Sequence, residues 1–147
     1  MSMRLVYGPV ASRRLGRSLG VDLVPFKTCS YDCSYCQLGR TTHKTVERAP
    51  YVATSELLAQ LDRQLERSPD ADYVTLAGSG EPTLHSDLGP IVREVKRRTK
   101  VPLAVITNGS LLSRADVRAE LLAADLVLPS LDAGEAHLFE CVNRPHP

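Results

Sequence analysis

The sequence predicts an α/β fold made of about four consecutive strand–helix units around a parallel sheet, in a single domain spanning residues 1–147. Three observations support this prediction. Short β-rich runs alternate with amphipathic helical stretches, there is no internal repeat or linker, and polar glycine-containing segments follow directly after the strands. A chain of 147 residues is long enough to bury one hydrophobic core.

The first unit begins with a strand at residues 21–25, with a short strand before it at residues 4–7. The helix of this unit is expected at residues 55–67, with Thr54 or Ser55 as its N-cap. Its core-facing side is indicated by leucines at helical spacing, namely Leu57, Leu58, Leu61 and Leu65.

The second and third units follow the same plan. A strand at residues 73–77 leads to a helix that Ser86 caps and that runs to about residue 100. The next strand is expected at residues 103–106, and its helix at residues 114–124.

The last unit has a strand at residues 125–131 and a helix at residues 135–141. The proline-rich residues 143–147 are expected to form a connector rather than a cap. Because four parallel strands do not close a barrel, the chain is either a short open sheet or the N-terminal portion of a longer (β/α) barrel. We favour the partial barrel.

Composition points to an ordinary globular protein without a membrane partner. The net charge of +1 gives no argument for or against nucleic acid, and no apolar run reaches the length of about 20 residues that a bilayer requires. The N-terminus lacks the apolar stretch of a secretory signal. We therefore expect a cytoplasmic protein, in which clustered cysteines are metal ligands rather than disulfides.

Three cysteines, Cys29, Cys33 and Cys36, lie in one short segment with the spacing C-x3-C-x2-C. No fourth cysteine or histidine is close enough in sequence to complete the set. Structural zinc sites and ferredoxin-type clusters normally have four protein ligands, so this segment predicts a metal site with one open position. Cys141 lies far along the chain and is expected to be a small buried hydrophobe.

Polar segments after the later strands are expected to share one edge of the sheet with these cysteines, because parallel strands end on the same side. Glycines in the segment 78–81 allow close backbone approach, and Glu81 can accept hydrogen bonds from an ammonium group. The alternative is an ordinary turn with a solvated Glu81. Similarly, Thr107-Asn108-Gly109 is either a binding segment or a common turn, and Ser130 and Asp132 either contact a ligand or cap the next helix.

The motif Cys29-x3-Cys33-x2-Cys36, with Tyr35 before the last cysteine, resembles the signature of the radical S-adenosylmethionine (SAM) enzymes. The segment Gly78-Ser-Gly-Glu-Pro82 is similar to the glycine-glycine-glutamate-proline motif of that superfamily. Residues 7–20 and 36–42 resemble one branch, the iron–sulfur oxidoreductases related to wyosine-type tRNA-modifying enzymes. The resemblance covers nearly the whole chain.

This resemblance implies a partial radical-SAM barrel that holds a [4Fe–4S] cluster. Cys29, Cys33 and Cys36 would bind three irons, and the amino and carboxylate groups of S-adenosyl-L-methionine would bind the fourth. One electron from the reduced cluster would cleave SAM to methionine and a 5′-deoxyadenosyl radical, which abstracts hydrogen from a substrate. Such chemistry belongs to the cofactor, while the protein binds and orients it.

The same resemblance assigns further residues to the SAM site. Glu81 would bind the SAM ammonium group and Tyr35 would flank the adenine. The loop glycines would line the site, and four residues at later strand ends are candidate ribose or methionine contacts. These residues are Gly78 and Gly80 in the loop and Thr107, Asn108, Ser130 and Asp132 at the strand ends.

The resemblance also bears on partners and on the extent of the domain. A reducing electron donor of flavodoxin or ferredoxin type is implied, with tRNA or a protein as substrate. Members of this family extend well past residue 147, so the chain is expected to be a core domain truncated at its C-terminus. Basic residues near the cysteines either contact phosphate or are ordinary solvated charge, and we favour solvated charge; these residues are Arg13, Arg14, Arg17, Arg40 and Lys44.

Two alternatives remain open. A truncated barrel could hold a cluster without turning over a substrate, as a non-catalytic iron–sulfur or electron-transfer module. A zinc-binding interaction domain would use the three cysteines and a distant fourth ligand, but it leaves the Gly78–Glu81 segment unexplained.

Overall fold

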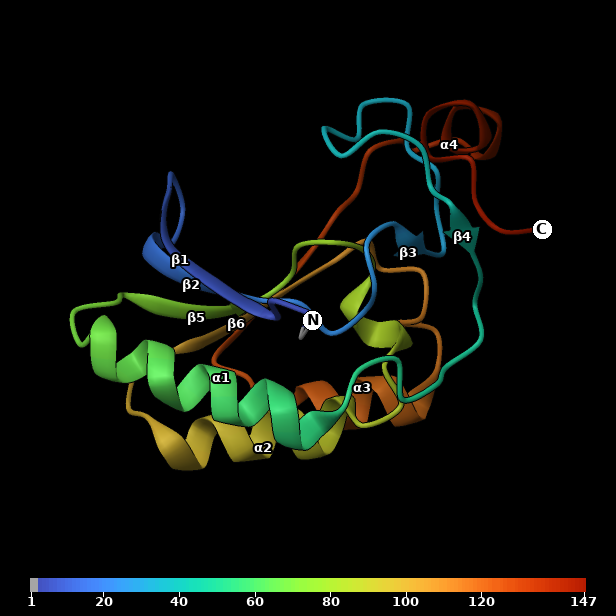
Figure 1. Ribbon diagram of the computed structural model, residues 1–147. Coiled ribbons are helices and arrows are strands. Elements are labelled where there is room, and N and C mark those ends of the chain that lie inside the picture. Colours follow the sequence, from blue (N-terminus) through green and yellow to red (C-terminus); the bar gives the residue numbers. More distant parts are fainter. Residues whose placement is uncertain (1–2) are drawn as a thin grey trace.

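The computed structural model describes residues 3–147. It contains a five-stranded sheet whose strands lie in the order β1 (Val6–Ser12), β2 (Gly16–Val21), β5 (Tyr73–Leu76), β6 (Leu103–Thr107) and β7 (Leu126–Pro129). Helices α1 (Thr54–Arg67), α2 (Leu88–Arg98) and α3 (Ala115–Leu121) cover one face of this sheet (Figure 1). The predicted α/β fold with a parallel sheet is confirmed.

Four strands of the sheet are parallel, as predicted, and β1 forms an antiparallel hairpin with β2. The predicted first strand at residues 21–25 is wrong, because β2 ends at Val21. The segment Gly16–Val21 pairs with β5 even though its glycines and arginine make a weak strand pattern, since Leu19 and Val21 are fully buried. Beyond it, Pro25 has no N–H for a ladder.

The starts of two helices also differ from the predictions. Ala53 is the N-cap of α1 and makes no side-chain cap bond, whereas Thr54 donates its hydroxyl to Asp87. Asp87, not Ser86, is the N-cap of α2. Helix α2 begins later than predicted for a local reason. A 3₁₀ turn at Pro82–Leu84 precedes it, and the His85 ring accepts the Asp87 N–H.

The remaining element boundaries shift by only a few residues. Helix α3 is shorter than predicted, β7 is trimmed at both ends, and the last helix, α4, spans Ala136–Asn143. No helix among the described residues is long and apolar enough to cross a membrane.

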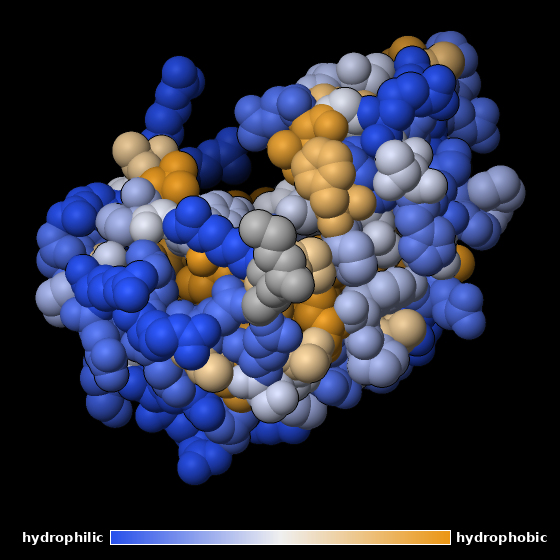
Figure 2. Space-filling model, viewed as in Figure 1, coloured by the Kyte–Doolittle hydropathy of each residue, from blue (hydrophilic) through white to orange (hydrophobic). Residues whose placement is uncertain are grey.

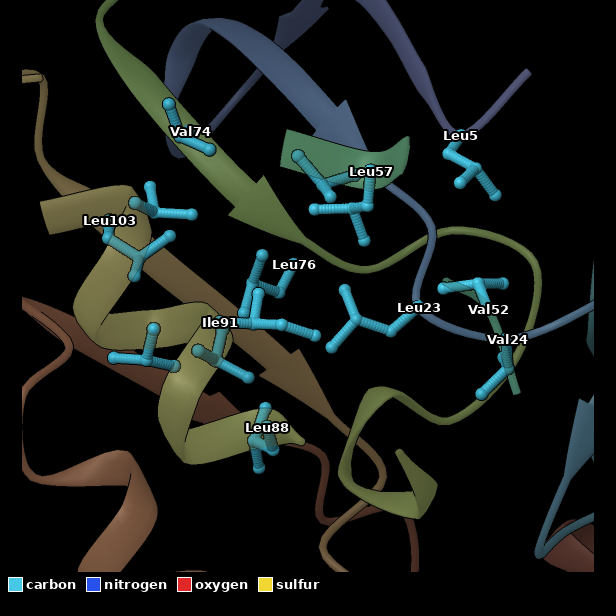
Figure 3. Close-up of a cluster of buried hydrophobic side chains, with 14 of the residues drawn as sticks. Leu5, Leu23, Val24, Val52, Leu57, Val74, Leu76, Leu88, Ile91 and Leu103 are labelled. Carbon is cyan, nitrogen blue, oxygen red and sulfur yellow. The ribbon is translucent and has the colours of Figure 1, made fainter. Parts of the chain in front are cut away.

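The core lies between the sheet and the three covering helices (Figure 3). The predicted leucine stripe of α1 is confirmed, with Leu57 and Leu61 fully buried. They meet Leu76 of β5 and Ile91 of α2 in one cluster of buried side chains. Burying an aliphatic side chain of this size stabilises the fold by about 1.5–3 kcal/mol, so this layer fixes the sheet and its strand ends.

The cysteine segment and the chain end form a second region beside the carboxyl ends of the strands (Figure 1). Short strands β3 (Thr28–Cys29) and β4 (His43–Lys44) pair in parallel, and α4 lies above them. Residues 143–147, which were expected to form a connector, pack against the cysteine loop. Pro145 bridges to Tyr31, and the His146 N–H donates to the Ser30 carbonyl at 2.8 Å, so this segment caps the cysteine loop.

Figure 2 shows that the molecule is hollowed between the β1–β2 hairpin and this second region, with apolar residues inside the hollow. A pocket of about 150 Å³ lies on that face of the sheet, lined in part by Tyr7, Val10 and Ile106. Among the described residues, α1, α2 and α3 lie on the opposite face, so the sheet presents this side openly (Figure 1).

Candidate functional site

The cysteine loop follows β3, at the edge where the parallel strands end. Cys29 is the last residue of β3, and two backbone turns follow it, in which Cys36 N donates to the Cys33 carbonyl and Gly39 N to the Cys36 carbonyl. Asp32 closes the loop by accepting the Thr41 N–H at 2.8 Å. The three cysteines are free and half-buried.

Each cysteine sulfur accepts a hydrogen bond from a nitrogen on a different segment. Lys27 Nζ lies 3.1 Å from Cys36 Sγ. The side-chain amide of Asn143 lies 3.3 Å from Cys33 Sγ, and that of Asn108 lies 3.5 Å from Cys29 Sγ. Burial raises the pKa of Cys29. Burial by itself therefore disfavours the thiolate of Cys29. The N–H donors act in the opposite direction, because they stabilise charge on sulfur, and they suit thiolates that are bound to a metal.

The Gly78–Glu81 loop packs directly on the segment that leads into Cys29. Lys27 N donates to the Ser79 carbonyl at 2.6 Å, and Glu81 N donates to the Thr28 carbonyl at 3.1 Å. A Cβ on Gly80 would lie 1.8 Å from the Thr28 carbonyl oxygen. This position therefore requires glycine, because any side chain would separate the two segments.

Asp22, which the sequence analysis missed, anchors the same loop from the end of β2. Its carboxylate accepts the Ser79 backbone N–H at 2.9 Å and the Ser79 hydroxyl at 2.6 Å. Gly78 has φ +106°, and a Cβ there would lie 1.8 Å from Asp22 Oδ1. The sequence analysis placed Asp22 inside a strand at residues 21–25, so its position directly after β2 became visible only in the structure. The serine between the two glycines therefore has a structural partner.

Glu81 is buried and joins the loop to the end of β6. Its Oε1 accepts both hydroxyls, from Thr107 at 2.5 Å and Thr83 at 2.6 Å, together with the Thr83 N–H. Its Oε2 accepts the Asn108 N–H at 2.7 Å. Burial raises the pKa of this carboxyl group, against the effect of these hydrogen bonds. The alternative of a solvated Glu81 is wrong, since its exposed fraction is 2%.

Most of the predicted site residues line one pocket of about 180 Å³ at this edge. Lys27, which the sequence analysis did not single out, also lines it. Its position two residues before Cys29 was the available signal. The predicted residues that line the pocket are Cys29, Cys36, Gly78, Gly80, Glu81, Thr107, Asn108 and Ser130.

Tyr35 and Asp132 lie outside that pocket and contact each other. The Tyr35 hydroxyl donates to Asp132 Oδ2 at 2.5 Å, and the Asn143 amide donates to the same oxygen at 2.7 Å. Burial raises the pKa of Tyr35. Asp132 lines a neighbouring pocket of about 350 Å³, which shares Asn108 and Ser130 with the first. The two pockets therefore flank the strand ends.

Cys33 does not line the smaller pocket. Cys141 is exposed, so the expectation that it is buried is wrong. The reason is that α4 presents only Asn143 as a buried residue, leaving Cys141 on its outer side.

The donor set fits an iron–sulfur cluster better than a single zinc ion. Among residues 3–147, no three Cys, His, Asp or Glu side chains gather closely enough to hold one metal ion. Zinc requires ligands that converge on one point, whereas in a cluster each thiolate binds a different iron. Three half-buried thiols with nitrogen donors, and without a fourth cysteine in the loop, match a cluster with one open iron.

This arrangement of cysteine loop and strand-end pocket defines a radical-SAM type of site. The family model described as Radical SAM superfamily matches residues 23–146, and the chain belongs to that superfamily. It is therefore a member of an enzyme family, and the predicted superfamily is confirmed.

Individual relatives match nearly the whole of this chain in sequence, but they are longer than it. A UPF0026 protein of Methanocaldococcus jannaschii is 42% identical over 98% of this chain and 45% of its own length. A protein of Brachyspira hyodysenteriae named GTPase Obg is 47% identical over 99% of this chain, which is 22% of that protein. The pattern GxxxxGK(S/T) of phosphate-binding P-loops does not occur in the present sequence.

A solved structure described as archaeal TYW1 superimposes with a TM-score of 0.53, covering 84% of this chain and 45% of that one. The sequence identity is 17%, so this likeness shows a shared fold. The chain spans less than half the length of each of these three proteins.

Proposed function

We propose that this domain binds a [4Fe–4S] cluster through Cys29, Cys33 and Cys36 and binds SAM at the open iron, as part of a radical SAM enzyme. The observation that carries the proposal is the set of three half-buried sulfurs, each with a nitrogen donor, beside the pocket of the Gly78–Glu81 loop. Superfamily membership supports it independently.

When bound and reduced, the cluster supplies one electron for cleavage of SAM to methionine and a 5′-deoxyadenosyl radical. The residues of this chain bind and orient the cofactors. Among the described residues, Glu81 Oε2 accepts a single hydrogen bond, from Asn108 N, and a carboxylate oxygen has a second lone pair. It therefore keeps capacity for the SAM ammonium group, which would also favour the ionised carboxylate.

The other predicted contacts divide between direct and indirect roles. Ser130 is exposed and lies between the two pockets, which suits a ribose contact. Thr107 gives its hydroxyl to Glu81, so its effect on SAM would pass through Glu81. We propose that Tyr35 flanks the adenine with its hydroxyl held by Asp132.

Partners are proposed on chemical grounds. A cluster that cleaves SAM needs a one-electron donor, of flavodoxin or ferredoxin type. The substrate is proposed to be a tRNA or a protein. Three of the basic residues that the sequence analysis grouped with the loop are engaged within the chain: Arg17 with Asp70, which precedes β5, Arg40 with Asp32, and Lys44 with backbone carbonyls. This leaves Arg13 and Arg14 of the β1–β2 turn as the candidates for a phosphate contact, while solvated charge is the interpretation that we favour for them.

The second candidate is a cluster-binding module without turnover. It is favoured by one observation, that the chain spans 45% of the length of the Methanocaldococcus relative. Barrel pockets are built from loops of many strands, and the described residues form four parallel strands, β2, β5, β6 and β7.

One experiment separates these functions. The chain is reconstituted anaerobically with iron and sulfide, reduced with dithionite and mixed with SAM, and 5′-deoxyadenosine is assayed. We expect a cluster and measurable 5′-deoxyadenosine, both lost in Cys33→Ala. A cluster without SAM cleavage would select the non-catalytic module. Tight zinc binding without a cluster, or SAM cleavage by Cys33→Ala, would overturn the proposal.

A further inference from the structure

Lys27 is a buried lysine whose ammonium group lies against a cysteine sulfur. Its exposed fraction is 3%, and Nζ lies 3.1 Å from Cys36 Sγ. Within residues 3–147 no ion pair involves Lys27. A buried charge is costly unless an opposite charge or hydrogen bonds compensate it, and the hydrogen bond that the structure gives this ammonium group is the one to Cys36 Sγ.

The backbone holds Lys27 in this position from two sides. Its N–H donates to the Ser79 carbonyl at 2.6 Å, and its carbonyl accepts the Thr42 and His43 N–H groups at 3.2 and 3.1 Å. Its φ of +60° is uncommon for a residue with a side chain. The backbone of Lys27 is therefore fixed between the Gly78–Glu81 loop and β4, and its ammonium group reaches Cys36.

Asn143 reaches a second sulfur from the end of α4. It is 2% exposed, and its amide nitrogen donates to Cys33 Sγ at 3.3 Å and to Asp132 Oδ2 at 2.7 Å. Its Oδ1 has no hydrogen-bond partner among the described residues. The backbone carbonyl of Asn143 accepts the Asp32 N–H at 3.0 Å, which ties α4 to the cysteine loop. The Asn143 amide is therefore oriented by its two acceptors, the Cys33 sulfur and the Asp132 carboxylate.

We propose that Lys27 and Asn143 are positioning residues that set the reduction potential of the cluster by donating N–H groups to two of its ligand sulfurs. This inference rests on the proposed function. Reduction adds one negative charge to a cluster, and hydrogen bonds to its sulfurs stabilise that charge and raise the potential. Lys27 carries a full charge and has the larger effect, while Asn143 contributes an amide dipole.

The test is a redox titration of the reconstituted chain, followed by the electron paramagnetic resonance signal of the reduced cluster. In Lys27→Met we expect the equilibrium constant for one-electron reduction to fall about tenfold, a shift of about 59 mV to more negative potential. Asn143→Leu should shift it in the same direction by a smaller amount.

Lys44→Met is the matched control. Lys44 lies in β4, opposite Cys29 in the short sheet, and donates to the carbonyls of Arg144 and Pro145 instead of to a sulfur. The Lys44→Met variant removes the same charge from an exposed position, so the reduction potential of its cluster should stay near that of the wild type. Equal shifts of the reduction potential in Lys27→Met and Lys44→Met would overturn the role proposed for the contact between Lys27 and Cys36.

Failure of the inference and failure of the proposed function give different results. A wild-type chain that takes up no iron and sulfide refutes the proposed function. A wild-type cluster whose potential is unchanged in both Lys27→Met and Asn143→Leu, at equal iron content, refutes only the inference. Should Lys27→Met lose the cluster, Lys27→Gln removes the charge, to which the larger effect is assigned, and keeps an N–H donor. An unchanged potential in Lys27→Gln then refutes the charge effect, and an unchanged potential in Asn143→Leu refutes the effect of the N–H donor.

Discussion

The sheet with α1–α3, here called the scaffold, and the region of residues 27–45 with α4 and the chain end, here called the site region, are held together by different forces. The buried apolar cluster of the scaffold contains no residue between positions 25 and 51 and none after Leu121. The buried residues of the site region are polar, namely Lys27, Thr28, Ser30, Asp32, Thr45 and Asn143.

This difference indicates how each part behaves. Apolar burial supplies most of the stability of a fold, while a typical hydrogen bond adds only about 0.5–1.5 kcal/mol net. Regions with few buried apolar contacts open at lower free energy than the core. We therefore expect the site region to open locally while the scaffold stays folded, and a bound cluster to restrain it.

The largest expected effect is a core truncation in the scaffold. Leu61→Ala removes a fully buried side chain of α1 and should lower the free energy of unfolding by about 2–5 kcal/mol. Urea denaturation measures the loss. Leu122→Ser, at an 84% exposed position, is the control and should stay within about 0.5 kcal/mol. Equal losses in both variants would contradict the assigned core.

Glu81 tests the junction between the two regions. Glu81→Gln places an amide N–H against the Asn108 N–H and should cost about 1–3 kcal/mol at acidic pH. The folded-state pKa of Glu81 is raised, so its favourable contribution is complete below the ordinary value of 4.5 and is lost as pH rises through the folded value. The deficit of the variant should therefore shrink with increasing pH. Urea midpoints measured across pH 4 to 8 check this sign; a growing deficit would contradict it.

A smaller and local effect is expected in the site region. Tyr31 and Phe139 pack edge to face with ring centroids 5.3 Å apart, a contact worth about 0.5–1.5 kcal/mol. In Phe139→Ala the amides of Asp32 and Ser34, which donate to the end of α4, should exchange about two- to tenfold faster. Amides of β5 serve as the internal control. Equal acceleration in β5 would show that the two regions open as one unit.

The smallest effect is expected at Cys141. Because this cysteine is exposed on α4, Cys141→Ser should change the free energy of unfolding by less than about 0.5 kcal/mol and leave the iron content of the reconstituted chain unchanged. Iron analysis beside Cys33→Ala, which should lose the cluster, makes the comparison. A loss of iron in Cys141→Ser would identify it as a fourth ligand.

Sequence patterns alone were sufficient to predict the elements that depend on local hydrophobic periodicity. The alternation of strands and helices predicted a parallel sheet, and its carboxyl edge correctly collected Cys29, Glu81, Asn108 and Ser130. Helix caps were less predictable, because Thr54 bonds Asp87 across the fold instead of capping its own helix. The contacts of residues 143–147 were not predictable for a similar reason, since their partners are Ser30 and Tyr31.

The sequence by itself determined the fold class, the cysteine motif and the edge of the sheet where the site lies, because hydrophobic periodicity and residue spacing are local properties. The tertiary structure alone decided which groups surround the sulfurs. The bonds from Asn108 to Cys29 and from Asn143 to Cys33 join residues 79 and 110 positions apart. Such contacts depend on how packed elements orient their side chains, and no local pattern records that orientation.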